Sequence, residues 1–259
     1  MEAYSIHQIA ELSGWSHDKI KNIKSYWLKQ QPPVISFNLS KCKYLVVDGT
    51  YFNHDFCLLV LYDSKINKVI SFIFTKKEDY RSAVEWFYSL CKAGLYPVSI
   101  TSDGSIGILR AICEIWPGCK VQRCLYHVKS QGERWLRLYP RTKLAQDLKY
   151  IIGQVCSVSN KELFWDSYLE WKRKYDDHIT ILNRKDKVEG DIISTYHMFE
   201  SAYKDLFYYL EDENILRTSN VLEGYFGHLK RKYRQHSGLR RSHLTSYLVW
   251  YIYFNNSKK

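Results

Sequence analysis

The sequence predicts an α/β protein with a mixed β-sheet, and the prediction rests on the order of apolar segments along the chain. Three short runs rich in Val, Ile, Phe and Tyr follow one another between residues 44 and 74, separated by polar turns. Two further short apolar runs then alternate with segments of helical periodicity. Strands joined by short turns pair antiparallel, whereas strands separated by helices pair parallel. The sheet should therefore begin antiparallel and end parallel.

Composition indicates a folded protein. Of the 259 residues, 46% are hydrophobic and 16% aromatic, which excludes a wholly disordered chain. The longest strongly apolar runs, 56–62 and 247–254, are shorter than the roughly 20 residues that span a membrane. The first ten residues lack the features of a secretory leader, and the seven cysteines form no regular framework. We expect a soluble, cytoplasmic protein with free thiols.

Residues 1–33 are expected to form a helix-turn-helix segment that binds DNA. Ser5 and Ser16 occupy N-cap positions of two short helices, and Gly14 lies in the turn between them. Three lysines lie on the second helix, as on a helix that contacts DNA: Lys19, Lys21 and Lys24. A small helical interaction or dimerisation module is the alternative, because such patterns also occur by accident. The pair of prolines beginning at Pro32 then marks a boundary.

The next segment, residues 42–127, contains the strands of the sheet. Strands are expected at Tyr44–Val47, Phe56–Tyr62, Val69–Phe74, Val98–Ser102 and Lys120–Leu125. Helices over 81–93 and 106–115 separate the last three of them. Three antiparallel strands followed by alternating helices and parallel strands is the order of the ribonuclease H-like fold.

Residues 128–216 read as an all-helical insertion into this domain. Helical periodicities cover 136–155, 161–175 and 193–210, without a convincing strand. Helices near 218–234 and 242–254 follow, so residues 217–259 should complete the domain that contains the sheet. Three tryptophans of the insertion are better explained by helix packing than by stacking on bases: Trp135, Trp165 and Trp171.

Two aspartates follow expected strands, and each precedes a glycine. Asp48 ends the first strand and Asp103 ends the fourth. If these strands are parallel neighbours, the two carboxylates converge on one crevice, where they would hold divalent cations. The alternative is a hairpin turn, because Asp-Gly after an apolar run is a strong turn signal. Taken alone, Asp48 favours the turn, whereas a helix after Asp103 weakens that interpretation.

A third carboxylate, Glu223, lies on a helix that runs directly into a basic segment. The chain carries a net charge of +11, and residues 228–241 contain no acidic side chain. The cations of this segment are Lys230, Arg231, Lys232, Arg234, Arg240 and Arg241. A metal-binding carboxylate beside phosphate-binding cations fits phosphoryl transfer on nucleic acid. A solvated helix face or a nuclear-type address is the alternative for the charge run alone.

Four motifs resemble those of the DDE transposases of bacterial insertion sequences, in the Mutator-like branch. They are Tyr44–Thr50, Ser99–Gly104, Gln122–His127 and Thr218–Lys230. Each is weak alone, but all four occur in the family's order, between residue 43 and about residue 239. The Cys-x-x-His step at Cys124 and His127 is a hallmark of that branch. So is the gap of 120 positions between the second and third acids.

The resemblance implies a catalytic assignment. It makes Asp48, Asp103 and Glu223 the ligands of two Mg²⁺ ions, with Mn²⁺ able to substitute. His127 would contact the scissile phosphate or orient a ligand, where a packed structural histidine is the alternative. It further implies metal-dependent strand cleavage and transfer of a 3′-hydroxyl. The partner is double-stranded DNA, as element ends and as target, and the protein would act as a homodimer or higher oligomer on it.

Three other interpretations remain. An inactive or domesticated descendant would only bind DNA, although the presence of all three acids argues against it. A ribonuclease H-like nuclease would cut without strand transfer, although the helical insertion disfavours it. A zinc site built from Cys113, Cys119, Cys124 and His127 is disfavoured, because only the last two have tight ligand spacing.

Overall fold

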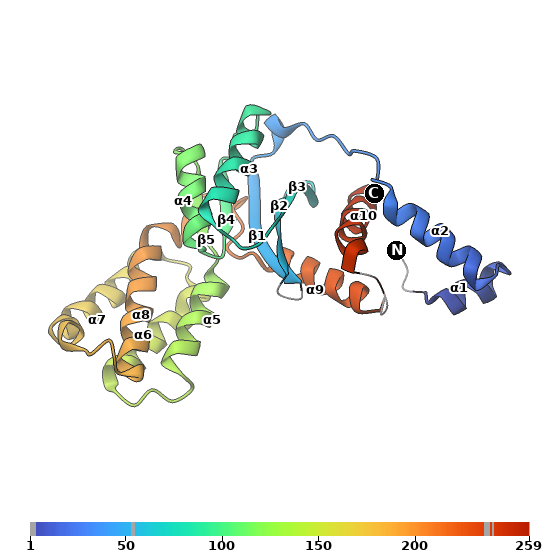
Figure 1. Ribbon diagram of the computed structural model, residues 1–259. Coiled ribbons are helices and arrows are strands. Elements are labelled where there is room, and N and C mark those ends of the chain that lie inside the picture. Colours follow the sequence, from blue (N-terminus) through green and yellow to red (C-terminus); the bar gives the residue numbers. More distant parts are fainter. Residues whose placement is uncertain (1–3, 53–54, 236–238, 240, 259) are drawn as a thin grey trace.

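The computed structural model describes residues 4–52, 55–235, 239 and 241–258, and it has a mixed α/β architecture (Figure 1). The sheet has the strand order β3-β2-β1-β4-β5. Its strands are β1 (Tyr44–Phe52), β2 (Phe56–Asp63), β3 (Lys68–Thr75), β4 (Ser99–Ser102) and β5 (Lys120–Arg123). The first three pair antiparallel, while β1 with β4 and β4 with β5 pair parallel. The predicted mixed sheet is confirmed.

Helices cover both faces of the sheet. Successive side chains of a strand point to opposite faces, and β1 follows this rule. Leu45 and Val47 pack with α3 (Tyr80–Lys92) and α4 (Ile106–Ile115). Val46 packs on the other face with α9 (Asn220–Gln235) and α10 (Leu244–Ser257). The central strand is therefore buried on both sides, which explains its apolar composition.

A second body lies beyond the β5 edge (Figure 1). It consists of α5 (Leu125–Leu136), α6 (Lys143–Gln154), α7 (Lys161–Ile181) and α8 (Lys187–Ala202). These helices enclose a core of their own, rich in aromatic rings such as Phe164, Tyr168 and Phe199. Trp165 and Trp171 pack in or against this core, as the packing interpretation predicts.

Three predicted boundaries were wrong for local reasons. β5 ends at Arg123, and Leu125 already begins α5. The periodicity over 136–155 is interrupted, because Arg137 adopts a φ of 63° and Pro140 follows in a loop before α6. The segment 193–210 is one helix only to Ala202, after which two 3-10 turns follow, Tyr203–Asp205 and Tyr208–Leu210.

The turn interpretation of Asp48 was also wrong. β1 continues through this residue to Phe52, with Asp48 opposite Val60 and Gly49 opposite Leu59 on β2. Pairing with β4, by contrast, stops at Val47. The parallel pairing of β1 with β4 therefore stops one residue before Asp48, whereas its antiparallel pairing with β2 continues through Asp48.

The amino-terminal helices form as their caps predict. Ser5 caps α1 (Ile6–Ser13), Ser16 caps α2 (His17–Lys29), and Gly14 ends the first helix. None of the α1 side chains is buried. The end of α2 rests on α10, where Trp250 Nε1 donates to the carbonyls of Trp27 (3.0 Å) and Gln30 (3.2 Å). These two helices are therefore held by the carboxyl-terminal helix. Over the described part of the chain, every helix is too short or too polar to cross a bilayer.

Candidate active site

Asp48 and Asp103 lie side by side at the carboxyl end of the parallel strands. The parallel pairing of β1 with β4 ends at Val47 and Ser102, and the two aspartates are the residues that follow. Backbone amides orient both carboxylates. Gly49 N donates to Asp48 Oδ1 (2.8 Å) and Ser105 N donates to Asp103 Oδ1 (3.0 Å). The structure therefore brings together the first two acids that the sequence singled out.

The electrostatics of this pair favour a bound cation. Burial, and then the charge of Asp103, raise the pKa of Asp48 to about 7, against the opposing hydrogen bond from Gly49. Two half-buried carboxylates that repel each other leave negative charge uncompensated, and hard divalent cations prefer carboxylate oxygens. The donor set at these strand ends thus fits Mg²⁺ or Mn²⁺.

A further carboxylate, Glu78, faces the same place and was missed in the sequence. It lies just before α3, half-buried, with Oε1 3.6 Å from Cys57 Sγ. A Cβ on Gly49 would lie only 2.3 Å from Glu78 Oε1, so the glycine after Asp48 makes room for this side chain. Burial, and then the charge of Asp103, raise the pKa of Glu78. No sequence signal marks it, because it stands in an ordinary polar loop after β3.

Glu223 enters from the first turn of α9 and contacts His127. The distance from His127 Nε2 to Glu223 Oε1 is 3.4 Å. The other ring nitrogen, Nδ1, lies 3.2 Å from Cys124 Sγ and 3.4 Å from Ser219 Oγ. Ser219 N also donates to Cys124 Sγ (3.2 Å). Cys124 therefore positions the His127 ring, and Nε2 of that ring contacts the Glu223 carboxylate.

The charge state of this cluster follows from its contacts. The hydrogen bond to Cys124, reinforced by the charges of Cys124, Asp48 and Asp103, raises the pKa of His127 to about 9 despite burial. Burial favours the neutral thiol of Cys124, but the hydrogen bonds from His127 and Ser219 outweigh it and lower its pKa. Near neutral pH the imidazole is therefore protonated, with one N–H toward sulfur and one toward Glu223.

The structure thus assembles the site in two parts, Asp48 beside Asp103 and Glu223 on His127. Among the described residues, no group of three or more His, Cys, Asp or Glu side chains is arranged to hold a metal ion. Metal ligation by all three acids stays a prediction. The zinc alternative gains no support there either, since Cys113 is exposed while Cys124 is buried.

The predicted DNA-binding cations lie in two places. Lys230, Arg231, Lys232 and Arg234 occupy the second half of α9, with both arginines exposed. Arg240 lies outside the described residues, and Arg241 begins a 3-10 turn before α10. On α2, Lys19 and Lys21 are exposed, whereas burial lowers the pKa of the half-buried Lys24. The α9 cations continue the helix that carries Glu223.

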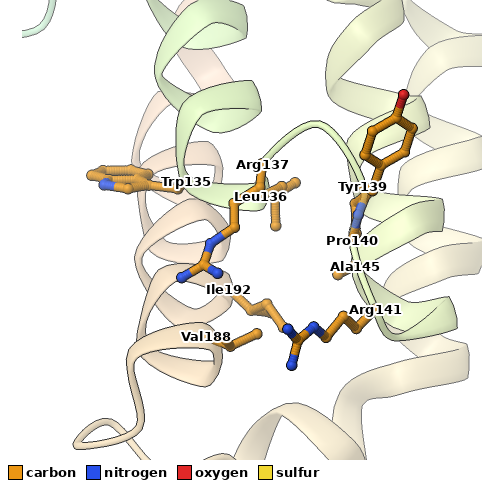
Figure 2. Close-up of a pocket in the computed structure, with 9 residues that line it drawn as sticks. All are labelled: Trp135, Leu136, Arg137, Tyr139, Pro140, Arg141, Ala145, Val188 and Ile192. Atoms are coloured by element: carbon orange, nitrogen blue, oxygen red, sulfur yellow. The ribbon is translucent and has the colours of Figure 1, made fainter.

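A shallow hollow lies at the far end of α5, away from these acids. Figure 2 shows Arg137 and Arg141 extending into it toward Val188 and Ile192, with the ring of Trp135 pointing aside. Arg137 Nη2 reaches within 4.0 Å of Asp191 Oδ2. The hollow contains no part of the acidic site.

Comparison with known proteins identifies relatives. The model of the family described as Transposase, Mutator family, matches residues 60–236, more than half of the chain. That match includes Asp103, His127 and Glu223, while Asp48 precedes it. The transposase for insertion sequence element IS1201 of Lactobacillus helveticus is 25% identical over 166 residues. The similar region covers 64% of this chain and 42% of that relative, so the chain spans less than half of the relative's length.

Proposed function

Since the chain belongs to the Mutator family of transposases, we propose that it carries the catalytic region of a DNA transposase of the DDE type. In this proposal it cleaves DNA strands at the ends of an insertion sequence and joins a 3′-hydroxyl to target DNA. The reaction is phosphoryl transfer that depends on a divalent metal ion.

The main support for the proposal is the parallel register of β1 and β4. This register makes Asp48 and Asp103 adjacent at the carboxyl ends of the paired segments. Ligands of open α/β sheets bind at such strand ends. The acids are half-buried and mutually repelling, which costs folding free energy. That cost is understandable if the pair serves to hold a cation.

The roles of the residues follow from their chemistry. Asp48, Asp103 and Glu223 would hold two Mg²⁺ ions, with Mn²⁺ as a substitute. When bound, one ion would activate water or a 3′-hydroxyl and the other would stabilise the leaving oxygen. His127 holds Glu223 and keeps a proton at Nε2, which it can donate toward a phosphate oxygen. Cys124 and Ser219 keep the imidazole in place.

We assign the sheet and its covering helices to a ribonuclease H-like catalytic domain. The strand order and pairing support this assignment, with three antiparallel strands leading into two parallel ones. Residues 42–127 and 217–259 form the domain and residues 128–216 its helical insertion. Residues 1–33 form a helix-turn-helix that contacts DNA through Lys19, Lys21 and Lys24. The protein works as a homodimer or higher oligomer on double-stranded DNA.

The test uses the purified chain with labelled DNA that carries the element ends, in Mg²⁺ or Mn²⁺. Asp48→Asn, Asp103→Asn and Glu223→Gln should each abolish nicking, while duplex affinity remains. Metal ions contribute several kcal/mol to such reactions, so a loss of about a thousandfold or more is expected. Matched controls on the exposed surface of α7, Glu162→Gln and Asp166→Asn, should retain wild-type rates.

Wild-type nicking by all three acid variants would refute the enzymatic proposal. Duplex binding without metal-dependent nicking by the unaltered chain would favour an inactive, DNA-binding descendant. Nicking without joined products would favour a nuclease that lacks strand transfer. Mapping the products on a sequencing gel distinguishes these outcomes.

A further inference from the structure

The motif Gln122–Arg123–Cys124 places three buried polar side chains in a row at the end of β5, and two of them are fully engaged. Gln122 Nε2 donates to the carbonyls of Arg123 (2.8 Å) and Leu206 (2.7 Å), and its Oε1 accepts from Tyr209 N (3.2 Å). Cys124 accepts from Ser219 N. The side chain of Arg123, between them, differs because it lacks such hydrogen bonds to described residues.

Arg123 is 6% exposed, yet its guanidinium makes no hydrogen bond or ion pair with any residue that the structure describes. Its Nε is completely buried and has no hydrogen-bond partner among the residues with described positions. Asp103 and Asp205 act on it electrostatically, but neither forms an ion pair with it. An isolated buried charge is costly, so an arginine in this position requires an explanation.

The guanidinium lies directly against the turn that follows Asp103. A Cβ on Gly104 would stand 2.1 Å from Arg123 Nη2 and 2.5 Å from Nε, so the absence of a side chain there makes the space for it. Gly104 has a φ of 105°, which permits this turn. The turn leads to the protein surface, since Ile106, two residues after Gly104, is 83% exposed. The guanidinium therefore lies against Gly104, the residue that follows Asp103, beside the carboxyl ends of β4 and β5.

We propose that Arg123 binds a phosphate of the DNA strand that lies across the Asp48–Asp103 strand ends. A guanidinium offers five N–H donors in a fork that matches phosphate oxygens, and none of these donors bonds a residue that the structure describes. The two aspartates would repel a bare DNA backbone, and a fixed cation beside them offsets that repulsion. This inference rests on the proposed function and adds the group that receives the substrate phosphate.

The experiment measures affinity for a labelled DNA duplex as a function of salt, in EDTA so that no strand is cut. Each neutralised phosphate contributes about 0.9 to the slope of log K against log salt. Arg123→Met should make that slope shallower by about 0.9 and weaken binding by roughly tenfold or more at low salt. Arg123→Lys keeps the charge but loses the fork, so it should keep the slope and bind less tightly.

A matched control and a folding measurement separate this role from a structural one. Arg173→Gln removes the same charge from the exposed surface of α7 and should leave both slope and affinity unchanged. Because the guanidinium of Arg123 bonds no side chain or carbonyl in the described ranges, Arg123→Met should melt at the wild-type temperature or higher. A large drop in its melting temperature, or an unchanged slope, would overturn the proposal.

Two further outcomes are distinguishable. If the unaltered chain shows no salt-dependent duplex binding, the proposed function fails together with this inference. If the unaltered chain binds the duplex with the expected salt dependence, and the Arg123 variants show the same affinity and slope, this inference fails while the proposed function stands. Inorganic phosphate that raises the melting temperature of the wild type but not of Arg123→Met, with the DNA slope unaltered, would assign the position to a free anion instead.

Discussion

The helical body and the carboxyl ends of the parallel strands differ in whether their partly buried polar side chains have partners. In the body, the Tyr168 hydroxyl and Lys172 Nζ both bond the Glu200 carboxylate, the latter at 2.7 Å. Tyr175 likewise donates to Asp147 Oδ2 at 2.8 Å. At the carboxyl ends of the parallel strands, Asp48 and Asp103 repel each other, and Arg123 Nε has no hydrogen-bond partner in the described part of the chain.

This difference separates groups that hold the protein together from groups that cost it stability. Satisfied polar networks rigidify a core, whereas unpaired or repelling groups persist only where the surrounding structure imposes them. Substitutions in the body should therefore lower stability. Neutralising substitutions at the carboxyl ends of the parallel strands should raise stability while they impair function.

The largest effect on stability is expected for Phe199→Ala in the body. Phe199 is fully buried and lies against Phe164, Trp165 and Tyr168. Such truncations leave a cavity and cost about 3–5 kcal/mol of unfolding free energy. Urea denaturation followed by tryptophan fluorescence measures the loss. A loss below about 1 kcal/mol would mean that the body does not depend on this aromatic core.

The opposite sign is expected for Asp48→Asn in the absence of metal. Because the folded pKa of Asp48 is about 7 and its ordinary value is 3.8, folding disfavours the ionised carboxylate. The stability of the wild type is thus intact below about pH 4 and declines as the pH rises through about 7. The amide never ionises, so at pH 8 the variant should be more stable by up to about 4 kcal/mol.

The pH series itself provides the control for Asp48→Asn. The two proteins should have the same unfolding free energy near pH 4 and should diverge toward alkaline pH. Mg²⁺ should stabilise the wild type at pH 8 and leave the variant almost unaffected. Equal stability of both proteins across the range would contradict the burial and repulsion at this strand end.

A smaller effect is expected for Glu200→Gln, which removes a charge from the body. The amide can still accept from Tyr168, but Lys172 loses its ionic partner, and both charged side chains are 31% exposed. Solvent screening limits the loss to about 1 kcal/mol. Urea denaturation at low and high salt measures it, and the difference should shrink as salt screens the pair. If Glu200→Gln were more stable than the wild type, the helical body would not differ from the strand ends in how its polar groups affect stability.

Local signals made much of the fold predictable. The caps at Ser5 and Ser16 and the five apolar runs lie where the sequence indicated them, because capping and strand periodicity depend on nearby residues. The pairing of Asp48 with β2 was not predictable from the Asp-Gly signal. The length of the partner strand decided it, and partner length is a tertiary property.

The site was predictable only where residue type and position coincide. Asp103 and Glu223 stand at element ends that periodicity locates. The Cys-x-x-His spacing marked Cys124 and His127, but the helix that brings them together was not predicted, because the strand was expected to continue to Leu125. Glu78 carries no such mark, because its proximity depends on how the chain returns from β3 to α3. The sequence likewise cannot show that Arg123 Nε lacks a hydrogen-bond partner among the described residues, because this depends on how the side chains pack.

The position of Glu223 also has a consequence for synthesis of the chain on the ribosome. It stands 120 positions after Asp103, beyond a body that has a core of its own. At about 5–20 residues per second, that interval takes roughly 6–24 s. Throughout it, the nascent chain carries both aspartates but lacks the helix that delivers the glutamate. On the proposed function, an unfinished chain is harmless to the DNA around it, and the ability to cut arises only as synthesis passes α9.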